Sequence, residues 1–156
     1  MTLKKHFIIL FSIFLGFTLD NLIIPFTNPY FIELSLGFMI FSYWVFAIPE
    51  KLHSFEALIY GAFIDLFFGE AVGFHMIFFT LISYITHVYV FRFRIFSYFQ
   101  LAIFFSGATT FFIASKYLIF FPENYSYLLL ILSFIINSII WIGVYFVMRA
   151  YRRKFL

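Results

Sequence analysis

The sequence predicts an all-α integral membrane protein with six transmembrane helices and with both termini in the cytoplasm. Three observations favour this class: the composition, the spacing of the helix-breaking residues and the distribution of positive charge. The chain of 156 residues is 65% hydrophobic and only 11% charged, whereas soluble domains carry about 25% charged residues. Because a soluble fold could not bury this much apolar surface, we expect residues 1–156 to form a single six-helix membrane domain.

Turn-forming and charged residues divide the chain into six apolar stretches. A bilayer core about 30 Å thick requires roughly 20 residues per helical span, so six spans take about 120 residues and leave no room for a soluble domain. The breaks fall at residues 25–29, 49–54, 69–73, 92–94 and 122–124. The predicted spans are residues 6–24, 31–48, 55–69, 74–91, 98–121 and 125–148.

The positive charges set the orientation of these spans, because cytoplasmic loops of membrane proteins are enriched in Lys and Arg. With the N-terminus inside, segments 1–6, 49–54, 92–97 and 149–156 are cytoplasmic, and they hold nine of the ten Lys and Arg residues. These nine are Lys4, Lys5, Lys51, Arg92, Arg94, Arg149, Arg152, Arg153 and Lys154. The pattern therefore predicts that both ends of the chain are inside.

Lys116 is the exception to the charge pattern. We expect it to snorkel to the outer surface or to pair with Glu123, seven residues further along the same helical face. The apolar run at residues 7–19 is short enough for a signal peptide, but no A-x-A-like cleavage site follows it. It meets Asp20 and Asn21 and then continues, so we expect a retained first helix.

Composition and motifs exclude several functions. The chain has no cysteine, which excludes disulfides, thiolate nucleophiles and cysteine metal sites. The net charge of +3 is located at helix ends, so we expect no nucleic-acid partner. His75 and His87 lie about three turns apart on one predicted helix, too far to share a metal ion. The sequence holds no phosphate loop, no G-x-S-x-G and no H-E-x-x-H, so we expect no cofactor and no enzymatic activity.

The stretch that carries chemistry is Y-G-A-F-I-D-L-F-F-G-E-A-V-G, residues 60–73. Gly61, Asp65 and Gly69 recur every four residues and so lie one above another on the third predicted helix, and Gly73 continues the spacing. Small residues at this spacing let a neighbouring helix approach closely. Since an aspartate exposed to lipid would cost roughly 2.5–3.5 kcal/mol, Asp65 is expected to face protein or water.

Glu70 and His75 flank the same outer hairpin, so the sequence predicts a polar pocket beside Asp65 that opens outward. Three alternatives remain open for it. Asp65 caps or hydrogen-bonds the loop and a neighbouring helix, or the pocket receives a segment of another protein, or it binds a proton, an ion or a small solute. Asp20 is another acid near the outer end of its span, but nothing in the sequence pairs it with Asp65.

Polar residues in the other spans are expected to hold helices together. Asn137 in the last span requires a hydrogen-bond partner across a helix interface, because its amide is costly in lipid. Trp141 follows one turn later and is grouped with Asn137 as a polar packing residue. Trp44 and Tyr43 are expected to anchor their span at the membrane interface. Further interhelical hydrogen bonds are expected from Ser12, Ser83, Ser106, Ser133 and Ser138.

Three segments taken together resemble a known family. They are Y-W-V-F-A-I-P-E-K (residues 43–51), G-A-F-I-D-L-F-F-G-E-A-V-G (61–73) and N-S-I-I-W-I-G-V-Y-F-V-M-R (137–149). In order and spacing, over nearly the whole chain, they resemble the rod shape-determining protein MreD family. The glycine–aspartate core is the most specific of the three segments.

The resemblance implies a role and a set of partners. Proteins of this family sit in the bacterial inner membrane, are not known as enzymes, and work with MreC, a single-span protein with a large periplasmic part. With MreB, RodA and a penicillin-binding transpeptidase they form the elongation machinery that builds the lateral cell wall. Their six-helix fold is thought to be similar to the substrate-binding S components of energy-coupling-factor transporters.

These expectations combine into one hypothesis and one alternative. The chain is expected to bind MreC through the outward pocket and its rim, formed by Gly61, Asp65, Gly69, Glu70, Gly73 and His75. It would then help to maintain rod shape and lateral peptidoglycan synthesis. A homodimer of this chain within the complex is part of the same hypothesis. The alternative is a small-solute-binding S component of an energy-coupling-factor-type transporter.

Overall fold

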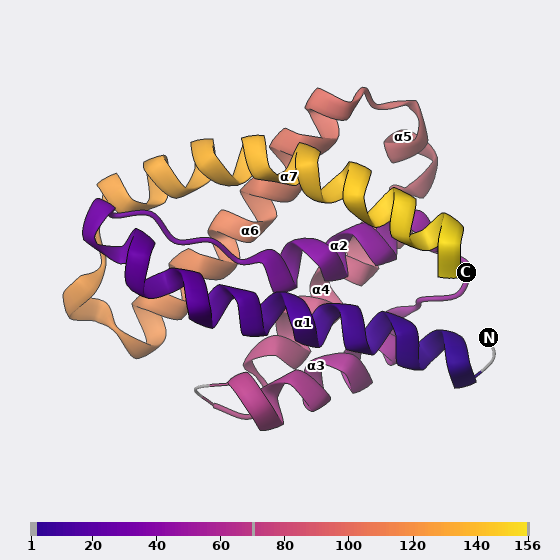
Figure 1. Ribbon diagram of the computed structural model, residues 1–156, viewed down its shortest axis with the longest axis horizontal. Coiled ribbons are helices and arrows are strands. Elements are labelled where there is room, and N and C mark those ends of the chain that lie inside the picture. Colours follow the sequence, from indigo (N-terminus) through magenta and orange to yellow (C-terminus); the bar gives the residue numbers. More distant parts are fainter. Residues whose placement is uncertain (1–2, 70, 156) are drawn as a thin grey trace.

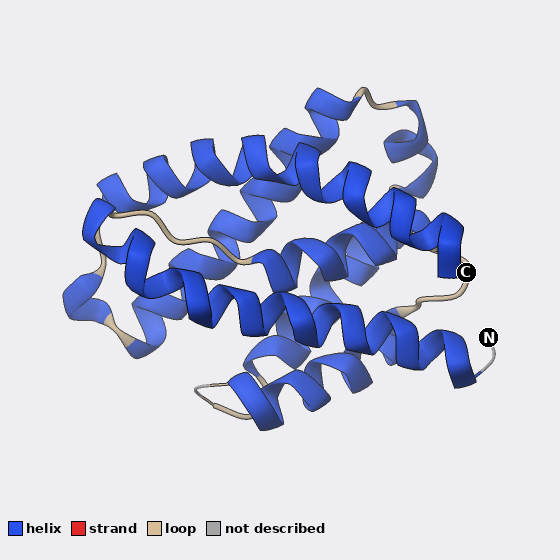
Figure 2. Ribbon diagram, viewed as in Figure 1, coloured by secondary structure: helices blue, strands red, loops and turns tan. Residues whose placement is uncertain are grey.

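The computed structural model describes residues 3–69 and 71–155, so the predicted site residue Glu70 lies outside the described part of the chain. Figure 2 shows these residues as helices joined by loops, with no strand among them. The elements in chain order are α1 (Leu3–Thr27), the 3-10 turn η1 (Asn28–Tyr30), α2 (Leu36–Ala47), α3 (Ser54–Phe68), α4 (Phe74–Val88), α5 (Val90–Ile95), α6 (Tyr98–Phe120), the 3-10 turn η2 (Pro122–Asn124) and α7 (Tyr127–Phe155).

Helix α2 forms the centre of the bundle. The helices pack as three neighbouring pairs, α1 with α2, α3 with α4 and α6 with α7, and α2 also contacts α4, α6 and α7 (Figure 1). A helix that is buried on all sides needs an apolar surface all round. The buried side chains of α2 follow each other without a polar face: Phe38, Met39, Phe41, Ser42, Tyr43, Trp44 and Val45.

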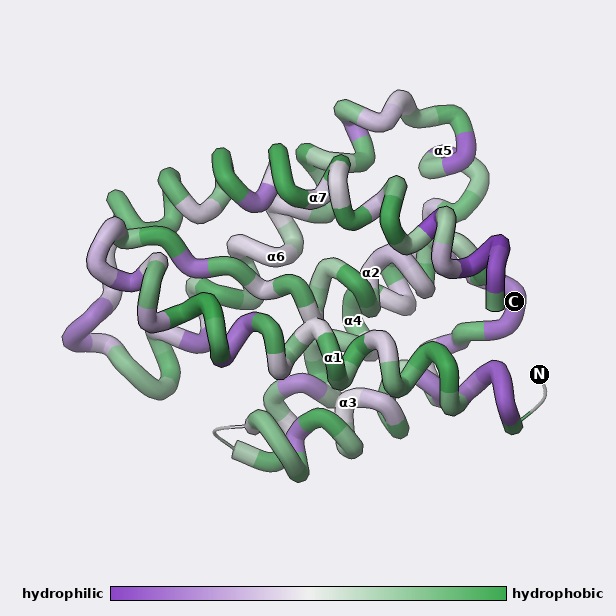
Figure 3. Tube along the Cα trace, in the orientation of Figure 1, coloured by the Kyte–Doolittle hydropathy of each residue, from purple (hydrophilic) through white to green (hydrophobic). Residues whose placement is uncertain are grey.

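The remaining helices show the surfaces expected of a membrane protein. Within the described ranges, three helices are long and apolar enough to cross a bilayer, namely Leu3–Tyr30, Tyr98–Phe120 and Tyr127–Phe155. Shorter apolar helices are Leu36–Ala47 and Phe74–Val88. Figure 3 shows apolar residues along these helices and hydrophilic ones at the ends of α1 and α7 near the termini. The chain is thus an all-helical integral membrane protein.

The second predicted span is helical over only part of its length. We expected a helix over residues 31–48, but residues 31–35 are irregular and α2 begins at Leu36. Phe31 has a positive φ of 57° and ends the 3-10 turn η1, which contains Pro29. Residues 31–35 cover at most about 17 Å and the 12 residues of α2 about 18 Å. Together they are as long as the core of a bilayer, about 30 Å.

Other boundaries differ at helix ends. The first helix continues through Pro25 to Thr27 instead of stopping at residue 24, and the last continues to Phe155 instead of 148. The fourth predicted span, residues 74–91, breaks at Tyr89 into α4 and the short α5. Charged ends of helices remain helical because backbone hydrogen bonds continue beyond the apolar stretch, which an argument from hydropathy does not detect.

Candidate functional site

Asp65 closes the α3–α4 hairpin by capping α4. Its carboxylate accepts hydrogen bonds from the backbone N–H groups of Gly73 (2.8 Å), His75 (2.9 Å) and Met76 (3.2 Å). The first N–H groups of a helix have no partner within the helix, and the helix dipole is positive at that end. A carboxylate from α3 supplies both the missing acceptors and the opposite charge. Asp65 therefore caps a neighbouring helix, which is the first of the three alternatives that the sequence left open.

The same carboxylate orients the His75 ring. Asp65 Oδ1 lies 2.7 Å from His75 Nδ1, and the Asp65 side chain is fully buried. Because an ionised carboxylate only accepts hydrogen bonds, Nδ1 carries the proton. The other ring nitrogen, Nε2, has no hydrogen-bond partner in residues 3–69 or 71–155. Asp65 thus fixes the direction in which Nε2 points.

Each glycine of the predicted stripe, Gly61, Gly69 and Gly73, is required at its position for a different structural reason. A Cβ on Gly61 would lie 2.5 Å from the Met76 Cα, so Gly61 is where the α3 and α4 backbones cross closely. A Cβ on Gly69 would lie 2.9 Å from Asp65 Oδ1, inside the cap itself. Gly73 has a φ of +106°, a conformation that side chains disfavour. The regular spacing of four therefore reflects one helix crossing and two turn positions.

Asp20 repeats this arrangement in the first helix pair. Its carboxylate accepts hydrogen bonds from the backbone N–H groups of Leu36 (2.7 Å) and Gly37 (2.9 Å), which begin α2. Gly16, four residues earlier, lies against Gly37, since a Cβ on Gly16 would be 2.8 Å from the Gly37 Cα. A G-x-x-x-D sequence in α1 thus acts on α2 as the one in α3 acts on α4. The sequence reasoning had considered Asp20 without finding this partner.

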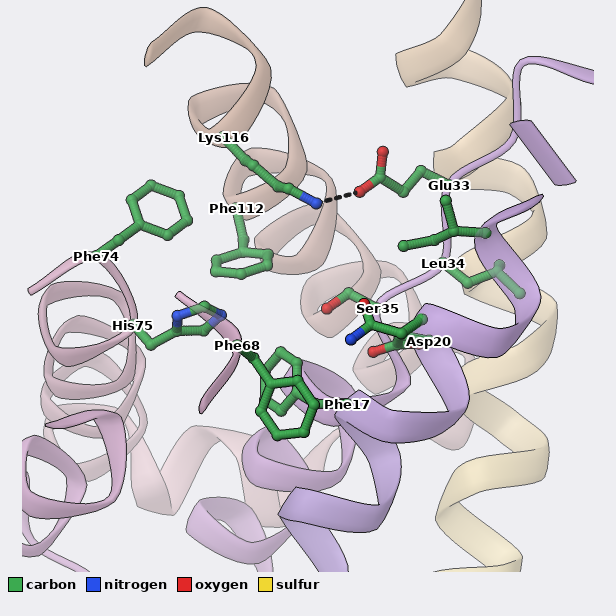
Figure 4. Close-up of a pocket in the computed structure, with 12 residues that line it drawn as sticks. Phe17, Asp20, Glu33, Leu34, Ser35, Phe68, Phe74, His75, Phe112 and Lys116 are labelled. Carbon is green, nitrogen blue, oxygen red and sulfur yellow. Dashed lines mark hydrogen bonds and ion pairs between the residues drawn. The ribbon is translucent and has the colours of Figure 1, made fainter. Parts of the chain in front are cut away.

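A buried ion pair links the irregular segment to α6. Lys116 Nζ lies 3.1 Å from Glu33 Oε1, and Glu33 is 5% exposed. The expectations for Lys116, snorkelling or pairing with Glu123, were therefore wrong. Glu33 lies 83 residues from Lys116 in the sequence, so no helical spacing relates the two. Figure 4 shows the lysine reaching from α6 toward Glu33 across the site.

Helix α7 holds the irregular segment in place. The Glu33 N–H donates to Ser133 Oγ at 2.9 Å, and the Glu33 carbonyl accepts from Asn137 Nδ2 at 3.1 Å. Non-helical backbone is tolerated within a membrane only where protein satisfies its polar groups. Asn137 does form a hydrogen bond to another part of the chain, as expected, but the acceptor is the backbone carbonyl of Glu33 in the irregular segment and not a group on another helix.

The two tryptophans lie in the interior. Trp141 is fully buried and stacks on Phe105, with ring centroids 5.2 Å apart. The expectation for Trp44 and Tyr43 was wrong, because both are buried and Trp44 Nε1 donates to Ser12 Oγ at 2.8 Å. The central position of α2 explains this, since its end lies inside the bundle and not at a lipid surface.

A small polar cavity lies where these groups meet. It has a volume of about 50 Å³, and its polar lining is Asp20, Asn21, Glu33, Ser35, His75 and Lys116. Phenylalanines close it, as Figure 4 shows for Phe17, Phe68, Phe74 and Phe112. Of the predicted pocket residues that the structure describes, only His75 lines it, and the Asp65 carboxylate lies behind the His75 ring.

The volume and the lining of the cavity limit what it can bind. A water molecule occupies at least about 10–15 Å³ in this measure, so the cavity holds a few waters. Pockets for small organic ligands measure about 300–1,000 Å³. Among the described residues, no three His, Asp or Glu side chains are grouped so that they could hold a metal ion. The carboxylates of Asp20, Glu33 and Asp65 are each bound to a helix end or to Lys116.

The fold and the site together define a multi-pass helical membrane protein whose buried charges join its helices. A family model described as rod shape-determining protein MreD matches residues 1–155. The chain therefore belongs to the MreD family, and it is a cell-shape protein of the bacterial inner membrane. No curated protein and no solved structure matches the chain.

Proposed function

We propose that this protein is a non-enzymatic assembly component of the cell-wall elongation complex, which binds MreC in the membrane. Through MreC it acts together with MreB, RodA and a penicillin-binding transpeptidase. One observation supports an assembly role above others. The buried carboxylates of Asp20, Glu33 and Asp65 all hold backbone segments or Lys116 in place. Each of these carboxylates thus has a structural partner that accounts for its place in the bundle.

The proposal includes six membrane crossings with both ends in the cytoplasm. The first turn of α1 and the last turn of α7 lie at the same end of the bundle, which supports an even number of crossings (Figure 1). The irregular segment with α2 is long enough for one crossing. Helices α3 and α4 have 15 residues each, or about 22 Å, so the loops at their ends complete those crossings.

The MreC contact is proposed for the end of the α3–α4 hairpin that faces away from the termini. Gly61 and Asp65 are buried, so they shape this end and do not touch a partner. Three apolar side chains beside them are exposed: Leu66 (73%), Phe67 (60%) and Val72 (77%). In the bilayer these side chains face lipid, and a transmembrane partner that replaces the lipid can pack against them, because the capped hairpin holds them in place. We had expected Gly61, Asp65, Gly69, Gly73 and His75 to form the partner interface themselves; in this proposal they hold the neighbouring surface in shape.

The small volume of the polar cavity supports this role over solute binding. A vitamin-sized ligand would require a pocket several times larger than about 50 Å³. We therefore do not propose a transporter S component.

Co-purification tests the proposal. The chain is co-expressed with tagged MreC from the same genome, and the amount that co-elutes is measured by quantitative mass spectrometry. Leu66→Ala with Phe67→Ala is expected to lower the co-eluting fraction about tenfold. The matched control is Leu118→Ala with Ile119→Ala on α6, two side chains of similar exposure (57% and 62%), which should leave the ratio unchanged. No complex with the unaltered chain, or equal loss in both pairs, contradicts the proposal.

A further inference from the structure

A polar pocket lies between two turns at the end of the bundle away from the termini. The first turn connects α1 to α2, and the second connects α6 to α7 (Figure 1). This site, the outer pocket, has a volume of about 300 Å³. The described residues that line it are all different from those of the buried cavity beside His75. Its polar lining is Asn28, Tyr117, Glu123, Asn124, Tyr125 and Ser126.

The walls of the outer pocket are held by contacts within the chain. Phe31, another lining residue, is tied to η1 by the hydrogen bond from its N–H to the Asn28 carbonyl at 3.0 Å. The Asn124 N–H donates to the carbonyl that begins η2, also at 3.0 Å. Tyr117 on α6 lies beside the Glu33 carboxylate of the irregular segment. The pocket therefore has a defined shape before anything binds in it.

Several polar side chains of the outer pocket are not used by the rest of the chain. Within residues 3–69 and 71–155, no hydrogen bond or ion pair involves the side chains of Asn28, Glu123 or Asn124. Asn28 belongs to η1, whereas Glu123 and Asn124 belong to η2, so folding brings these groups together from distant parts of the sequence. A few polar groups that converge on a concave site are typical of ligand binding.

The charge and the aromatic rings of the outer pocket favour a cation. Among the described residues that line it, Glu123 is the one charged side chain, and no Lys, Arg or His lies with it. The rings of Phe31, Tyr117 and Tyr125 line the same pocket. Cations are attracted both to a carboxylate and to the face of an aromatic ring. The pocket thus lacks the positive charge that its lining would bind.

An arginine side chain fits this lining better than other cations. Its guanidinium is planar, donates five N–H groups and stacks on aromatic rings, whereas a lysine ammonium is a compact and strongly hydrated point charge. The carboxylate and the amide oxygens of the pocket supply several acceptors for such a planar group. The amine of a zwitterionic phospholipid would bring its own phosphate close to Glu123, and like charges repel. A volume of about 300 Å³ is also at the lower limit for small organic ligands.

We propose that the outer pocket binds an arginine side chain of a second protein at the outer face of the membrane. The guanidinium pairs with Glu123, donates to the side-chain oxygens of Asn28 and Asn124, and stacks on an aromatic ring of the lining. A single side chain binds weakly, but a partner held in the same membrane presents it at a high effective concentration. The proposal takes only the membrane orientation from the proposed function. It does not involve the α3–α4 hairpin, so the two proposals can fail separately.

An NMR titration of the purified chain tests the site. The ¹⁵N-labelled protein in an uncharged detergent is titrated with the peptide acetyl-Gly-Arg-Gly-amide, and the backbone amide signals of Asn124 and Ser126 are followed. We expect saturable shifts of these signals with a millimolar dissociation constant. The same peptide with citrulline in place of arginine keeps the shape without the charge and should bind about fivefold more weakly. The lysine peptide should lie between the two.

Variants of the lining identify the groups that bind. Glu123→Gln removes the charge and should weaken the arginine peptide about fivefold, with an unchanged melting temperature showing that the fold is intact. The matched control is Glu50→Gln, an exposed acid at the other end of the bundle, which should change nothing. Absence of saturable shifts, equal binding of the arginine and citrulline peptides, or unaltered binding in Glu123→Gln overturns the proposal. A stronger response to glucose or to phosphorylethanolamine than to the arginine peptide would assign the pocket to a hydroxylated solute or a lipid headgroup and also overturn it.

Discussion

Asp20 and Asp65 occupy equivalent positions in two helix pairs. Each follows a glycine by four residues, and each glycine lies where the backbone of the next helix crosses closely. Each carboxylate then accepts hydrogen bonds from the N-terminal N–H groups of that next helix, α2 for Asp20 and α4 for Asp65. The pairs α1–α2 and α3–α4 are thus joined by the same means, a glycine crossing followed by an acidic cap.

This relationship explains why buried acids are tolerated in a chain of such low polarity. A carboxylate without partners is costly inside a membrane. At the start of a helix it meets unpaired N–H groups and the positive end of the helix dipole. The buried carboxylate of Glu33 is stabilised differently, by its ion pair with Lys116.

Removal of the Asp65 cap is expected to destabilise the protein. Asp65→Ala leaves the N–H groups of Gly73, His75 and Met76 without an acceptor, and each buried unpaired group costs about 1–3 kcal/mol. We expect a loss of about 3 kcal/mol or more, measured as a lower melting temperature in detergent. Asp65→Asn keeps one acceptor oxygen and should lie between Asp65→Ala and the original chain. Glu123→Ala at an exposed turn serves as control. An unchanged melting temperature of Asp65→Ala would contradict the capping role.

Glycine substitutions should have opposite signs at two positions. Gly61→Ala places a methyl group 2.5 Å from the Met76 Cα and must push α3 and α4 apart. Gly107→Ala would place its methyl group at an ordinary contact distance of 4.0 Å from Phe134 Cε2, and it should stabilise α6 by up to about 1 kcal/mol, because alanine favours a helix. Thermal unfolding of both variants under the same conditions checks this. Equal effects of the two substitutions would contradict the described crossing.

The Glu33–Lys116 pair should show strong coupling in a double-mutant cycle. Lys116→Met leaves Glu33 buried without its cation, which we expect to cost about 2–3 kcal/mol, less than a fully buried pair would. The reduction reflects the 24% exposure of the Lys116 side chain. Glu33→Gln combined with Lys116→Met should cost less than the sum of the two single changes. Strict additivity in chemical unfolding would show that the two side chains do not interact.

Release of the irregular segment is expected when its α7 partner is lost. Because the chain has no cysteine, a Leu34→Cys variant reports on the segment through the rate of thiol labelling. Asn137→Leu removes the donor to the Glu33 carbonyl and should accelerate labelling about fivefold to tenfold. Ser138→Ala is the matched control, since its hydroxyl donates only to Phe134 within α7. Identical labelling rates in both variants would count against the role of Asn137.

The six crossings can be tested by thiol labelling in whole cells. Asn124→Cys is expected to react with a membrane-impermeant reagent from outside, since η2 lies at the end away from the termini. Lys51→Cys should react only after lysis, because the loop after α2 lies at the other end. The opposite result for either position would refute the proposed orientation.

Much of the architecture could be predicted from the sequence. Apolar stretches and their breaks located the helices α1, α2, α3, α4, α6 and α7 of the described chain, although α2 is shorter than predicted, because hydropathy and turn residues act locally. The stretch around Asp65 stood out because an acid inside an apolar helix needs a reason. Its capping role was one of three alternatives, and only the folded chain shows the three N–H groups of α4 beside it.

The parts that were missed depend on contacts between distant residues. Glu33 lies inside the second predicted span, and a charge there was a signal that the span is not a simple helix. Its partners Lys116, Ser133 and Asn137 lie on α6 and α7, so no spacing rule relates them. The repeat of G-x-x-x-D at Gly16–Asp20 and Gly61–Asp65 was visible in the sequence, and comparing the two would have predicted the cap of α2.

The irregular segment at residues 31–35 also bears on how the protein is made. Its backbone bonds join residues 100 and 104 positions apart, and its ion pair joins residues 83 apart. During synthesis the segment therefore leaves the ribosome long before α6 and α7 exist. Its polar groups must stay hydrated or be held by the insertion machinery until the last helix arrives. A chain truncated before α7 would keep the Asp20 cap of α2, but it would lose both hydrogen bonds that hold the backbone of Glu33.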